Sequence, residues 1–389
     1  MVLRSRRDSV SKARVATMEN ALEGGLEHDL EKDEEHMTTP ELLASSKSLR
    51  PLRALRIFAA LAFLVTASCQ FTRAQDAPAP AAPPAQNPAL NPANVEVHVL
   101  HVQGNVYMLA GAGGNITMQV GTDGVLLVDT GLPGASDKVL AAIRSVTNEP
   151  IRYIIDTHVH PDHTGGNEAL AKAGNTITGG NVVGDIGASA GDQAAILAFQ
   201  TVLDRMSAPT GQKAPTPQGA WPTETYTTPE RKLFFNGEAV QVIHIPDAHT
   251  DGDSIVFFHR SDVISTGDIF ITTHYPIVDM SRGGNIQGII AGLNRIIELA
   301  TPGPTDEGGT LIIPGHGRLC DQSDVVFYQE MVTIIRDRIQ DMINKGMTLE
   351  QVKAARPTQD YDPRYGATTG IWTTDMFVEA VYKSLTKKD

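Results

Sequence analysis

The interpretation of this 389-residue chain starts from the stretch Thr157-His158-Val159-His160-Pro161-Asp162-His163-Thr164-Gly165-Gly166. It follows the apolar residues 151–155, a pattern that predicts a buried strand. His158 and His160 are two positions apart in an extended segment, so we expect their side chains to leave the same face. Asp162 and His163 come where the chain turns into the glycine pair, which would direct them to a second point nearby. A lone His-x-His is usually surface or scaffold, but four potential ligands within six positions favour a metal site.

Three more potential ligands follow at wide intervals along the chain. They are His249 in Asp247-Ala248-His249-Thr250-Asp251-Gly252-Asp253, Asp268 in Thr266-Gly267-Asp268, and His316 in Pro314-Gly315-His316-Gly317. Imidazole and carboxylate together suit zinc, with iron or manganese as alternatives. Two metal ions roughly 3.5–4 Å apart can hold a bridging hydroxide and polarise a carbonyl or phosphoryl oxygen. We predict structural roles for the histidines outside these motifs and the leader, which are His98, His101, His244, His259 and His274.

The order and context of these motifs resemble the metallo-β-lactamase superfamily, from about residue 95 to about residue 320. The resemblance implies an α/β fold, a four-layer αββα sandwich with additional C-terminal helices. It also implies two zinc ions per chain. The ligands it implies are His158, His160 and His249 for the first metal, Asp162, His163 and His316 for the second, and Asp268 as the bridge between them. Asp162 and Asp268 are the carboxylates to which it assigns catalytic roles.

An aspartate upstream also falls in a recognisable context. The strand expected at 125–128 ends in Asp129-Thr130-Gly131. This resembles the superfamily's first motif, whose aspartate supports the metal ligands from behind. A turn residue at the end of a strand explains the same aspartate equally well. The sequence leaves both interpretations of Asp129 open.

The ligand set separates this chain from some branches of the superfamily. β-Lactamases of the cysteine subclass carry Cys where this chain has Asp268, and the all-histidine subclass lacks the bridging Asp. The set resembles that of the second glyoxalase and of the lactonases. The context of His316 differs from the glyoxalase pattern, and Ile271 stands where lactonases that open acyl-homoserine lactones carry Tyr. The motifs also look like those of a widespread group of exported hydrolases.

The resemblance implies an exported, binuclear metal-dependent hydrolase. In that mechanism a metal-bridging hydroxide attacks the carbonyl of an ester, thioester, lactone or amide. One alternative is a β-lactamase that hydrolyses β-lactam antibiotics, and another is a non-catalytic metal-binding module. Structural zinc sites are usually closed and rich in cysteine, and this ligand set contains no cysteine. The composition of the ligand set therefore favours an enzyme.

Composition and charge narrow the class of partner. The chain is 41% hydrophobic and 20% charged, as in globular proteins, and its formal net charge is −13. Such an acidic chain argues against general binding to nucleic acid or to anionic membranes. We therefore expect a small-molecule substrate, no nucleic-acid partner and no stable membrane span. The oligomeric state is not predicted.

Residues 1–74 are interpreted as a leader that carries a signal peptide. A basic flank precedes the mostly apolar residues 57–68, a segment too short to span a bilayer as a helix. Cleavage after Ala74 would export the protein, and we expect a periplasmic location. A lipoprotein anchor at Cys69 is the alternative. Because this signal-like segment lies unusually far from the start of the chain, residues 1–36 are interpreted as an over-extended gene start.

The remainder of the chain divides into three predicted parts. Residues 75–94 are rich in proline and alanine and are interpreted as a semi-rigid linker. Residues 95–320 form the predicted catalytic domain, and residues 321–389 a helical extension. After cleavage Cys320 is the remaining cysteine, so we expect no internal disulfide and a buried thiol.

Apolar segments and helical patterns alternate along the predicted catalytic domain. Expected strands lie at 95–101, 106–109, 116–120, 125–129, 151–155, 239–245, 254–259, 262–265 and 311–313. Expected helices lie at 135–145, within 185–206, and at 288–299, 325–344, 348–355 and 373–385. The glycine cluster at 111–114 lacks the lysine and hydroxyl residue of a phosphate loop, so it is predicted to be a turn.

Substrate selection is assigned to two loops because ligands shared by many hydrolases cannot distinguish substrates. One is the loop expected at 207–231, with Trp221 and Tyr226. The other is the segment 272–284 just after Asp268, with His274 and Tyr275. Tyr275 could donate a hydrogen bond to an oxyanion, or it could be an ordinary half-buried aromatic residue.

Overall fold

The computed structural model describes residues 92–176, 193–208, 211–303 and 308–387. The predicted leader and most of the predicted linker lie outside these residues, so the signal peptide and the domain boundaries remain predictions. Among the described residues, no helix is both long and apolar enough to cross a membrane.

The first sheet contains seven strands in sequence order, each hydrogen-bonded to the next. They are β1 (His98–Gln103), β2 (Val106–Ala110), β3 (Ile116–Gly121), β4 (Gly124–Val128), β5 (Ile151–Ile155), β6 (Ala195–Phe199) and β7 (Glu224–Tyr226). The pairs from β1 to β4 are antiparallel and those from β4 to β7 are parallel. Because Val128 pairs with Ile155, Asp129 and the histidine motif leave the same edge of the sheet.

The second sheet contains five strands in the order β12-β11-β10-β9-β8. They are β8 (Glu230–Phe235), β9 (Glu238–His244), β10 (Ser254–Phe258), β11 (Val263–Ser265) and β12 (Leu311–Ile313). The strands β11 and β12 are parallel, with Ser265 beside Ile313. The loops that follow these two residues carry Asp268 and His316, so the pairing brings both side chains to one edge.

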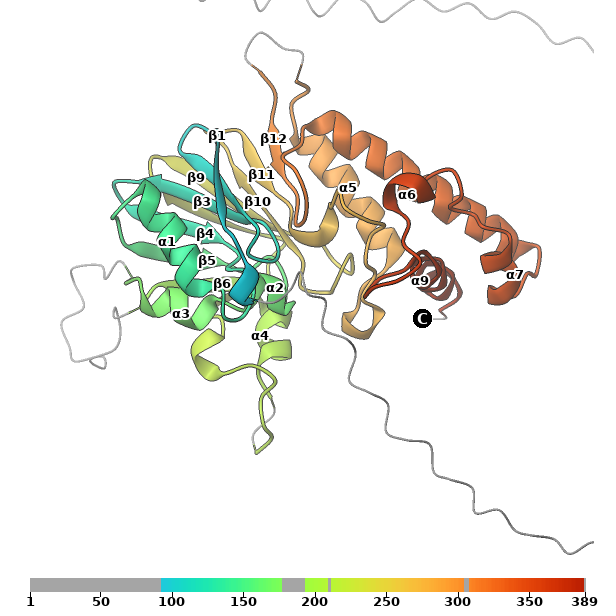
Figure 1. Ribbon diagram of the computed structural model, residues 1–389, viewed down its shortest axis with the longest axis horizontal. Helices are drawn as coiled ribbons and strands as arrows, with labels where there is room; N and C mark the ends of the chain where they lie inside the picture. Colours follow the sequence, from blue (N-terminus) through green and yellow to red (C-terminus); the bar gives the residue numbers. More distant parts are fainter. Residues whose placement is uncertain (1–91, 177–192, 209–210, 304–307, 388–389) are drawn as a thin grey trace, which may run out of the picture. The chain divides into compact units, whose positions relative to one another are not determined.

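Three hydrophobic clusters separate four layers. Side chains of both sheets, such as Val128 and Val256, fill the space between the sheets. The outer face of the first sheet packs against α1 (Ser136–Val146) and α3 (Asn167–Lys172). The outer face of the second sheet packs against α5 (Ile286–Leu299) and the C-terminal helices. Figure 1 shows α1 and α3 on one side of the strands and α5 on the other. The predicted four-layer αββα sandwich with C-terminal helices is confirmed.

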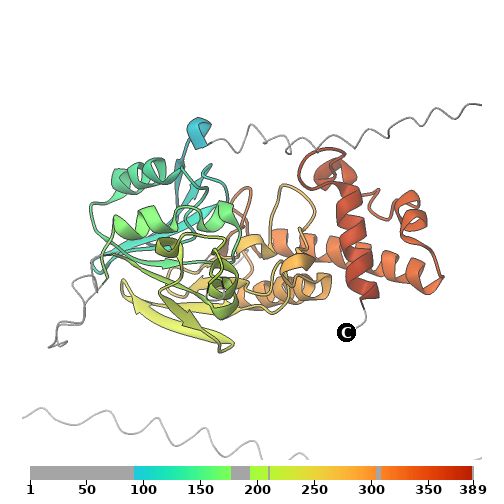
Figure 2. The same cartoon turned by 90° about the horizontal axis from the view of Figure 1, so that it is seen from below.

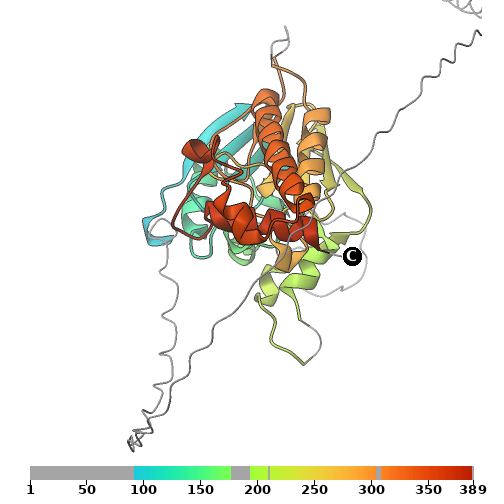
Figure 3. The same ribbon diagram turned by 90° about the vertical axis from the view of Figure 1, so that its right-hand side faces the viewer.

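The C-terminal residues form helices that continue the outer layer of the second sheet. They are α6 (Gln322–Asn344), α7 (Leu349–Ala354), α8 (Asp362–Tyr365) and α9 (Thr374–Thr386). Residues of α6 and α9 share one hydrophobic cluster with α5 and the second sheet. Figures 2 and 3 show α5 and α6 side by side, with the last helices beside them. The three predicted helices are present, and the four-residue α8 is too short to have a recognisable period.

The secondary structure between residues 185 and 231 was predicted incompletely. The helix expected within 185–206 is α4 (Gln200–Met206), but the apolar residues before it form the strand β6, which was not predicted. Periodicity cannot separate a short buried strand from a helix, which explains why β6 was missed. The expected loop 207–231 contains β7 and the start of β8. Strand β7 has three residues, and β8 begins with three exposed residues, so neither gave an apolar signal.

Neighbouring isoleucines on α6 test the packing of the C-terminal helices. Ile335 is fully buried in the cluster shared with α5, whereas Ile334 is 40% exposed. We expect Ile335→Ala to lower the free energy of unfolding by about 2–5 kcal/mol, because it leaves a cavity. Ile334→Ala should change it by less than about 0.5 kcal/mol. Urea unfolding followed by circular dichroism measures both, and equal effects would contradict the assigned packing.

Candidate metal centre

The histidine motif changes from a bent loop to a helix in its middle. After β5 the chain bends at residues 157–159 and reaches His160, whose backbone is extended and which is the N-cap of the short helix α2 (Pro161–Thr164). Pro161 occupies the first helical position, where its missing N–H costs nothing. Asp162 and His163 therefore project from a helical turn, and the His163 ring lies against that of His158, with ring centroids 4.3 Å apart. This change of direction divides the motif between two points.

The structure brings together all seven predicted site residues, in two adjoining groups. The first group is His158, His160, His249 and Asp268, and the second group is Asp162, His163 and His316. Within each group the potential ligand atoms all lie within 4.8 Å of one another. Asp268 also faces the second group, since its Oδ1 lies 3.2 Å from His163 Nε2 and 3.5 Å from His316 Nε2. The assignment of individual ligand and catalytic roles remains a prediction.

Ring nitrogens converge in both groups. Nε2 of His249 lies 2.8 Å from Nδ1 of His160, and Nε2 of His163 lies 3.3 Å from Nε2 of His316. Two buried atoms, Nε2 of His158 and Oδ1 of Asp268, take part in no hydrogen bond. Buried polar atoms without partners are costly, and a bound cation would satisfy both. Five imidazoles and two carboxylates suit transition-metal ions, so the residues present fit a two-metal site.

The second nitrogen of three histidines is held by an acceptor. His163 Nδ1 donates to Asp129 Oδ2 at 2.7 Å, and His249 Nδ1 donates to the Ile277 carbonyl at 2.7 Å. His160 Nε2 donates to Asp279 Oδ2 at 2.9 Å. Such partners fix the tautomer and the orientation of a metal-binding imidazole. The free nitrogen of each ring is thereby aimed at the other ligands.

Asp129 serves both roles that the sequence left open. It directly follows β4 and has a positive φ of 65°, as a turn residue does. Its carboxylate accepts hydrogen bonds from the Thr157 amide and hydroxyl, each at 2.8 Å, and from His163. Asp129 thus joins the residue before His158 to His163. The structure supports the interpretation in which it holds the metal ligands from behind.

Asp279 is a site residue that sequence reasoning missed. It caps the 3-10 helix η5 (Met280–Arg282) and also receives hydrogen bonds from His160 and from Arg282 Nη1, at 2.6 Å. Burial would raise the pKa of Asp279, but the hydrogen bonds from His160 and Ser281 hold it well below the usual value. No local motif marks this residue, because 119 positions separate it from His160.

Burial keeps two histidines of the first group neutral. It lowers the pKa of His158 well below its ordinary value and that of His249 to about 4. Neutral imidazole is the form that binds metal. These two rings therefore have a free electron pair available at physiological pH.

The second group is more strongly charged. Burial would raise the pKa of Asp268, but His316 and His163 outweigh it and hold that pKa well below the usual range. The same histidines lower the pKa of Asp162 to about 2 against the effect of burial. For His163, burial is outweighed by Asp268 and Asp129, which raise its pKa. A cation bound by this group would displace a proton from His163.

Two glycines allow the loops to approach the ligands. A Cβ atom at Gly114 would overlap the ring of His163, and one at Gly315 would overlap Oδ1 of Asp268. Close packing against His163 therefore explains the glycine at position 114 in the predicted turn at 111–114. A larger residue at either position would displace a ligand.

The family model of the metallo-beta-lactamase superfamily matches residues 109–286. Residues 109–286 are therefore a domain of the metallo-β-lactamase superfamily. A linear primary-alkylsulfatase from Pseudomonas sp. is 24% identical over 271 residues, which cover 62% of this chain and 50% of that protein. The chain thus spans about half the length of this curated relative.

Solved structures are similar in fold. The stereoselective inverting sec-alkylsulfatase Pisa1 from Pseudomonas sp. has a TM-score of 0.52 and 16% identity, over 74% of this chain and 50% of that one. A double mutant of the sec-alkyl sulfatase PisA1 has a TM-score of 0.53 and 15% identity, over the same shares. At this identity the likeness concerns the superfamily fold alone.

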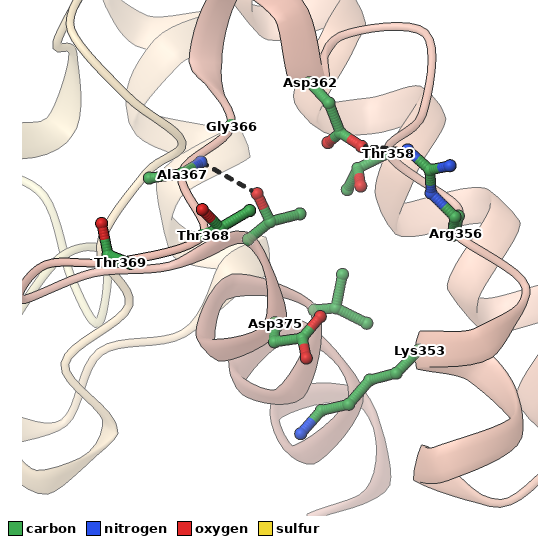
Figure 4. Close-up of a pocket in the computed structure, with 11 residues that line it drawn as sticks. Lys353, Arg356, Thr358, Asp362, Gly366, Ala367, Thr368, Thr369 and Asp375 are labelled. Carbon is green, nitrogen blue, oxygen red and sulfur yellow. Dashed lines mark hydrogen bonds and ion pairs between the residues drawn. The ribbon is translucent and has the colours of Figure 1, made fainter.

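The structure corrects the suggestion that Tyr275 donates to an oxyanion. Tyr275 is buried and stacks on Phe377, and its hydroxyl lies 3.0 Å from Asp362 Oδ1 and 3.2 Å from the Thr358 carbonyl. Thr358 and Asp362 line a cavity of about 610 Å³ among the C-terminal helices, shown in Figure 4, that contains none of the seven site residues. Tyr275 therefore anchors the segment 272–284 to these helices.

Two other residues of the proposed substrate loops, Tyr226 and Trp221, also make structural contacts. Tyr226 lies in the layer between the sheets and bonds Ser254 Oγ at 2.7 Å, so it does not line a substrate loop. Trp221 donates to the Thr216 carbonyl and packs with Val159 on a small apolar cluster. Trp221 thus packs on the same cluster as Val159 of the histidine motif. Its contact with substrate remains a prediction.

Replacing Asp129 tests its role in the centre. Asp129→Asn removes the charge that faces His163, so we expect the metal ion bound by the second group to lose about 10–100-fold in affinity. Competition titration against a chromophoric chelator measures this change.

Asp262 provides a matched control, since it is also a turn aspartate with positive φ whose carboxylate accepts a hydroxyl hydrogen bond, from Thr310. Asp262→Asn should leave both affinities unchanged. Unaltered metal binding in Asp129→Asn would show that Asp129 is a turn residue alone.

Proposed function

We propose that this protein is a binuclear metal-dependent hydrolase that cleaves an ester-type bond in a small molecule. The observation that carries the proposal is the convergence of seven ligand side chains in two groups that share Asp268. Membership of the metallo-β-lactamase superfamily supports the same reaction class. We propose zinc as the resident metal, with iron or manganese as alternatives. Export to the periplasm is proposed from the signal-like residues 57–68 alone.

The ligand side chains are more exposed to solvent on one side of the centre than on the other. His158, His163 and His249 are at most 1% exposed, whereas Asp162 and His316 are 28% and 24% exposed. Two metal ions held here would activate water and polarise the bond to be broken. A substrate would approach over Asp162 and His316, while the buried ligands keep other water away. Asp162, ionised and adjoining His316, is placed to orient the attacking water.

A sulfate ester is the substrate class with specific support beyond the centre itself. The curated relative is named as an alkylsulfatase and matches 62% of this chain. Carboxylic esters, thioesters, lactones and amides belong to the same proposal, because the ligands do not distinguish the group attacked. β-Lactam hydrolysis is the alternative within the same superfamily.

A purely structural metal site has less support. Its usual ligands are thiolates, and no cysteine belongs to either group. Cys320 is buried, as predicted, and burial raises the pKa of its thiol to about 12. A thiol that stays protonated at neutral pH neither binds metal readily nor acts as a nucleophile.

A substrate panel with a matched variant tests the proposal. The metal-loaded protein should hydrolyse at least one of an alkyl sulfate, an aryl sulfate, a carboxylic ester, a thioester, a lactone and a β-lactam. In Asp268→Ala we expect kcat/KM to fall by more than about 100-fold, beyond the loss seen when an outer partner of a ligand is removed. Metal analysis should show lower occupancy in the same variant.

The control is Asp375→Ala, since Asp375 is an exposed aspartate that lines the cavity of Figure 4. Its activity and metal content should equal those of the wild type. Two tightly bound metal ions without turnover of any substrate would support the structural alternative. One bound ion, with full activity in Asp268→Ala, would exclude the binuclear centre.

A further inference from the structure

The short helix α4 contacts the loops on both sides of the first group. Val159, which lies between His158 and His160, packs on a small cluster of Ala198, Val202 and Met206. Two of these three residues belong to α4. The position of the histidine motif therefore depends on apolar contact with this helix.

The polar face of α4 holds the loop that carries His249. Arg205 binds Asp251 through two hydrogen bonds, from Nε at 2.7 Å and from Nη2 at 2.5 Å. Thr201 donates from its hydroxyl to the Asp251 carbonyl at 3.1 Å. Arg205 and Asp251 are 29% and 24% exposed, so the pair is partly removed from solvent. A bidentate pair of this kind fixes direction as well as distance.

Asp251 continues the connection to His160. Its amide donates to the Arg282 carbonyl at 2.9 Å, and Arg282 Nη1 donates to Asp279 Oδ2 at 2.6 Å. The same Asp279 oxygen accepts from His160 Nε2, and the Asp279 amide donates to the His249 carbonyl at 3.0 Å. A chain of hydrogen bonds thus runs from α4 to two ligands of the first group.

We propose that Arg205 is a positioning residue that sets the spacing of His160 and His249, and so the metal affinity of the first group. This inference rests on the proposed metal-dependent function. Without Arg205, the carboxylate of Asp251 would lose its bidentate partner while its amide stays bound to Arg282. The freed carboxylate of Asp251 would then compete with the carboxylate of Asp279 for the Arg282 guanidinium. Asp279 would hold His160 less firmly. Among the described residues, the side chains of the second group make no hydrogen bond to Arg205, Asp251, Arg282 or Asp279, and the His163 amide meets only the carbonyl of His160, at 3.0 Å.

Cobalt(II) titration in two backgrounds separates the groups. His163→Ala disables the second group, and His249→Ala disables the first. We would add Arg205→Gln to each background and to the wild type, and follow cobalt affinity by chelator competition and by visible absorption. Arg338→Gln is the control, because Arg338 also makes two bonds, to Asp360 and to the Pro357 carbonyl, but within the C-terminal helices.

In the His163→Ala background, Arg205→Gln should lower cobalt affinity about tenfold, the lower end for outer partners of metal ligands, and should alter the absorption spectrum. In the His249→Ala background it should change neither. Arg205→Lys keeps the charge without the bidentate geometry and should show a smaller loss. It also supplies the comparison if Arg205→Gln does not fold.

Unchanged affinity and spectrum in the His163→Ala background would overturn the inference, and so would equal losses in both backgrounds. The wild type separates this failure from that of the proposed function. If it binds two cobalt ions while Arg205→Gln behaves identically, the positioning role is wrong and the metal centre stands. If it binds no cobalt, both proposals fail.

Discussion

The buried carboxylate of Asp268 is the interaction on which the centre depends. Its two oxygens face opposite groups, with Oδ1 3.2 Å from His163 Nε2 and Oδ2 3.6 Å from His249 Nε2. A charge at 5% exposure is unfavourable unless it is paired on several sides. The surrounding histidines provide that pairing, and a bound cation would complete it. The requirement explains why the loops must meet so closely here, down to the glycine at 315.

Rigid elements supply the positions of these loops. The pairing of Val128 with Ile155 places Asp129 beside the histidine motif, and the pairing of Ser265 with Ile313 places Asp268 beside the loop of His316. Each loop begins where a buried strand ends, so the two sheets fix the positions of the ligands. Binding and catalytic residues often occur on loops held by such a scaffold.

The C-terminal helices are connected to the same region. The hydroxyl of Tyr275 forms hydrogen bonds with Thr358 and with Asp362, the first residue of α8. The ring of Tyr275 stacks on Phe377 of α9. The segment between Tyr275 and Asp279 is thus held at one end by these helices and at the other by His160. The helices therefore belong to the description of the site.

The sequence by itself determined the identities and order of the seven candidate ligands, most of the strands and the layered fold. These properties are local, since alternating or apolar runs and short motifs reveal them within a few residues. Strand β6 was missed because a short apolar run does not distinguish a strand from a helix. Strand β7 was missed because it has three residues, and β8 because it begins with three exposed residues. The tertiary structure alone decided which nitrogen of each histidine faces the centre, that Asp279 and Arg205 support it, and that Tyr275 does not. Each of these depends on a contact between residues far apart in the chain, and hydrogen bonds across such distances leave no periodic trace in a single sequence.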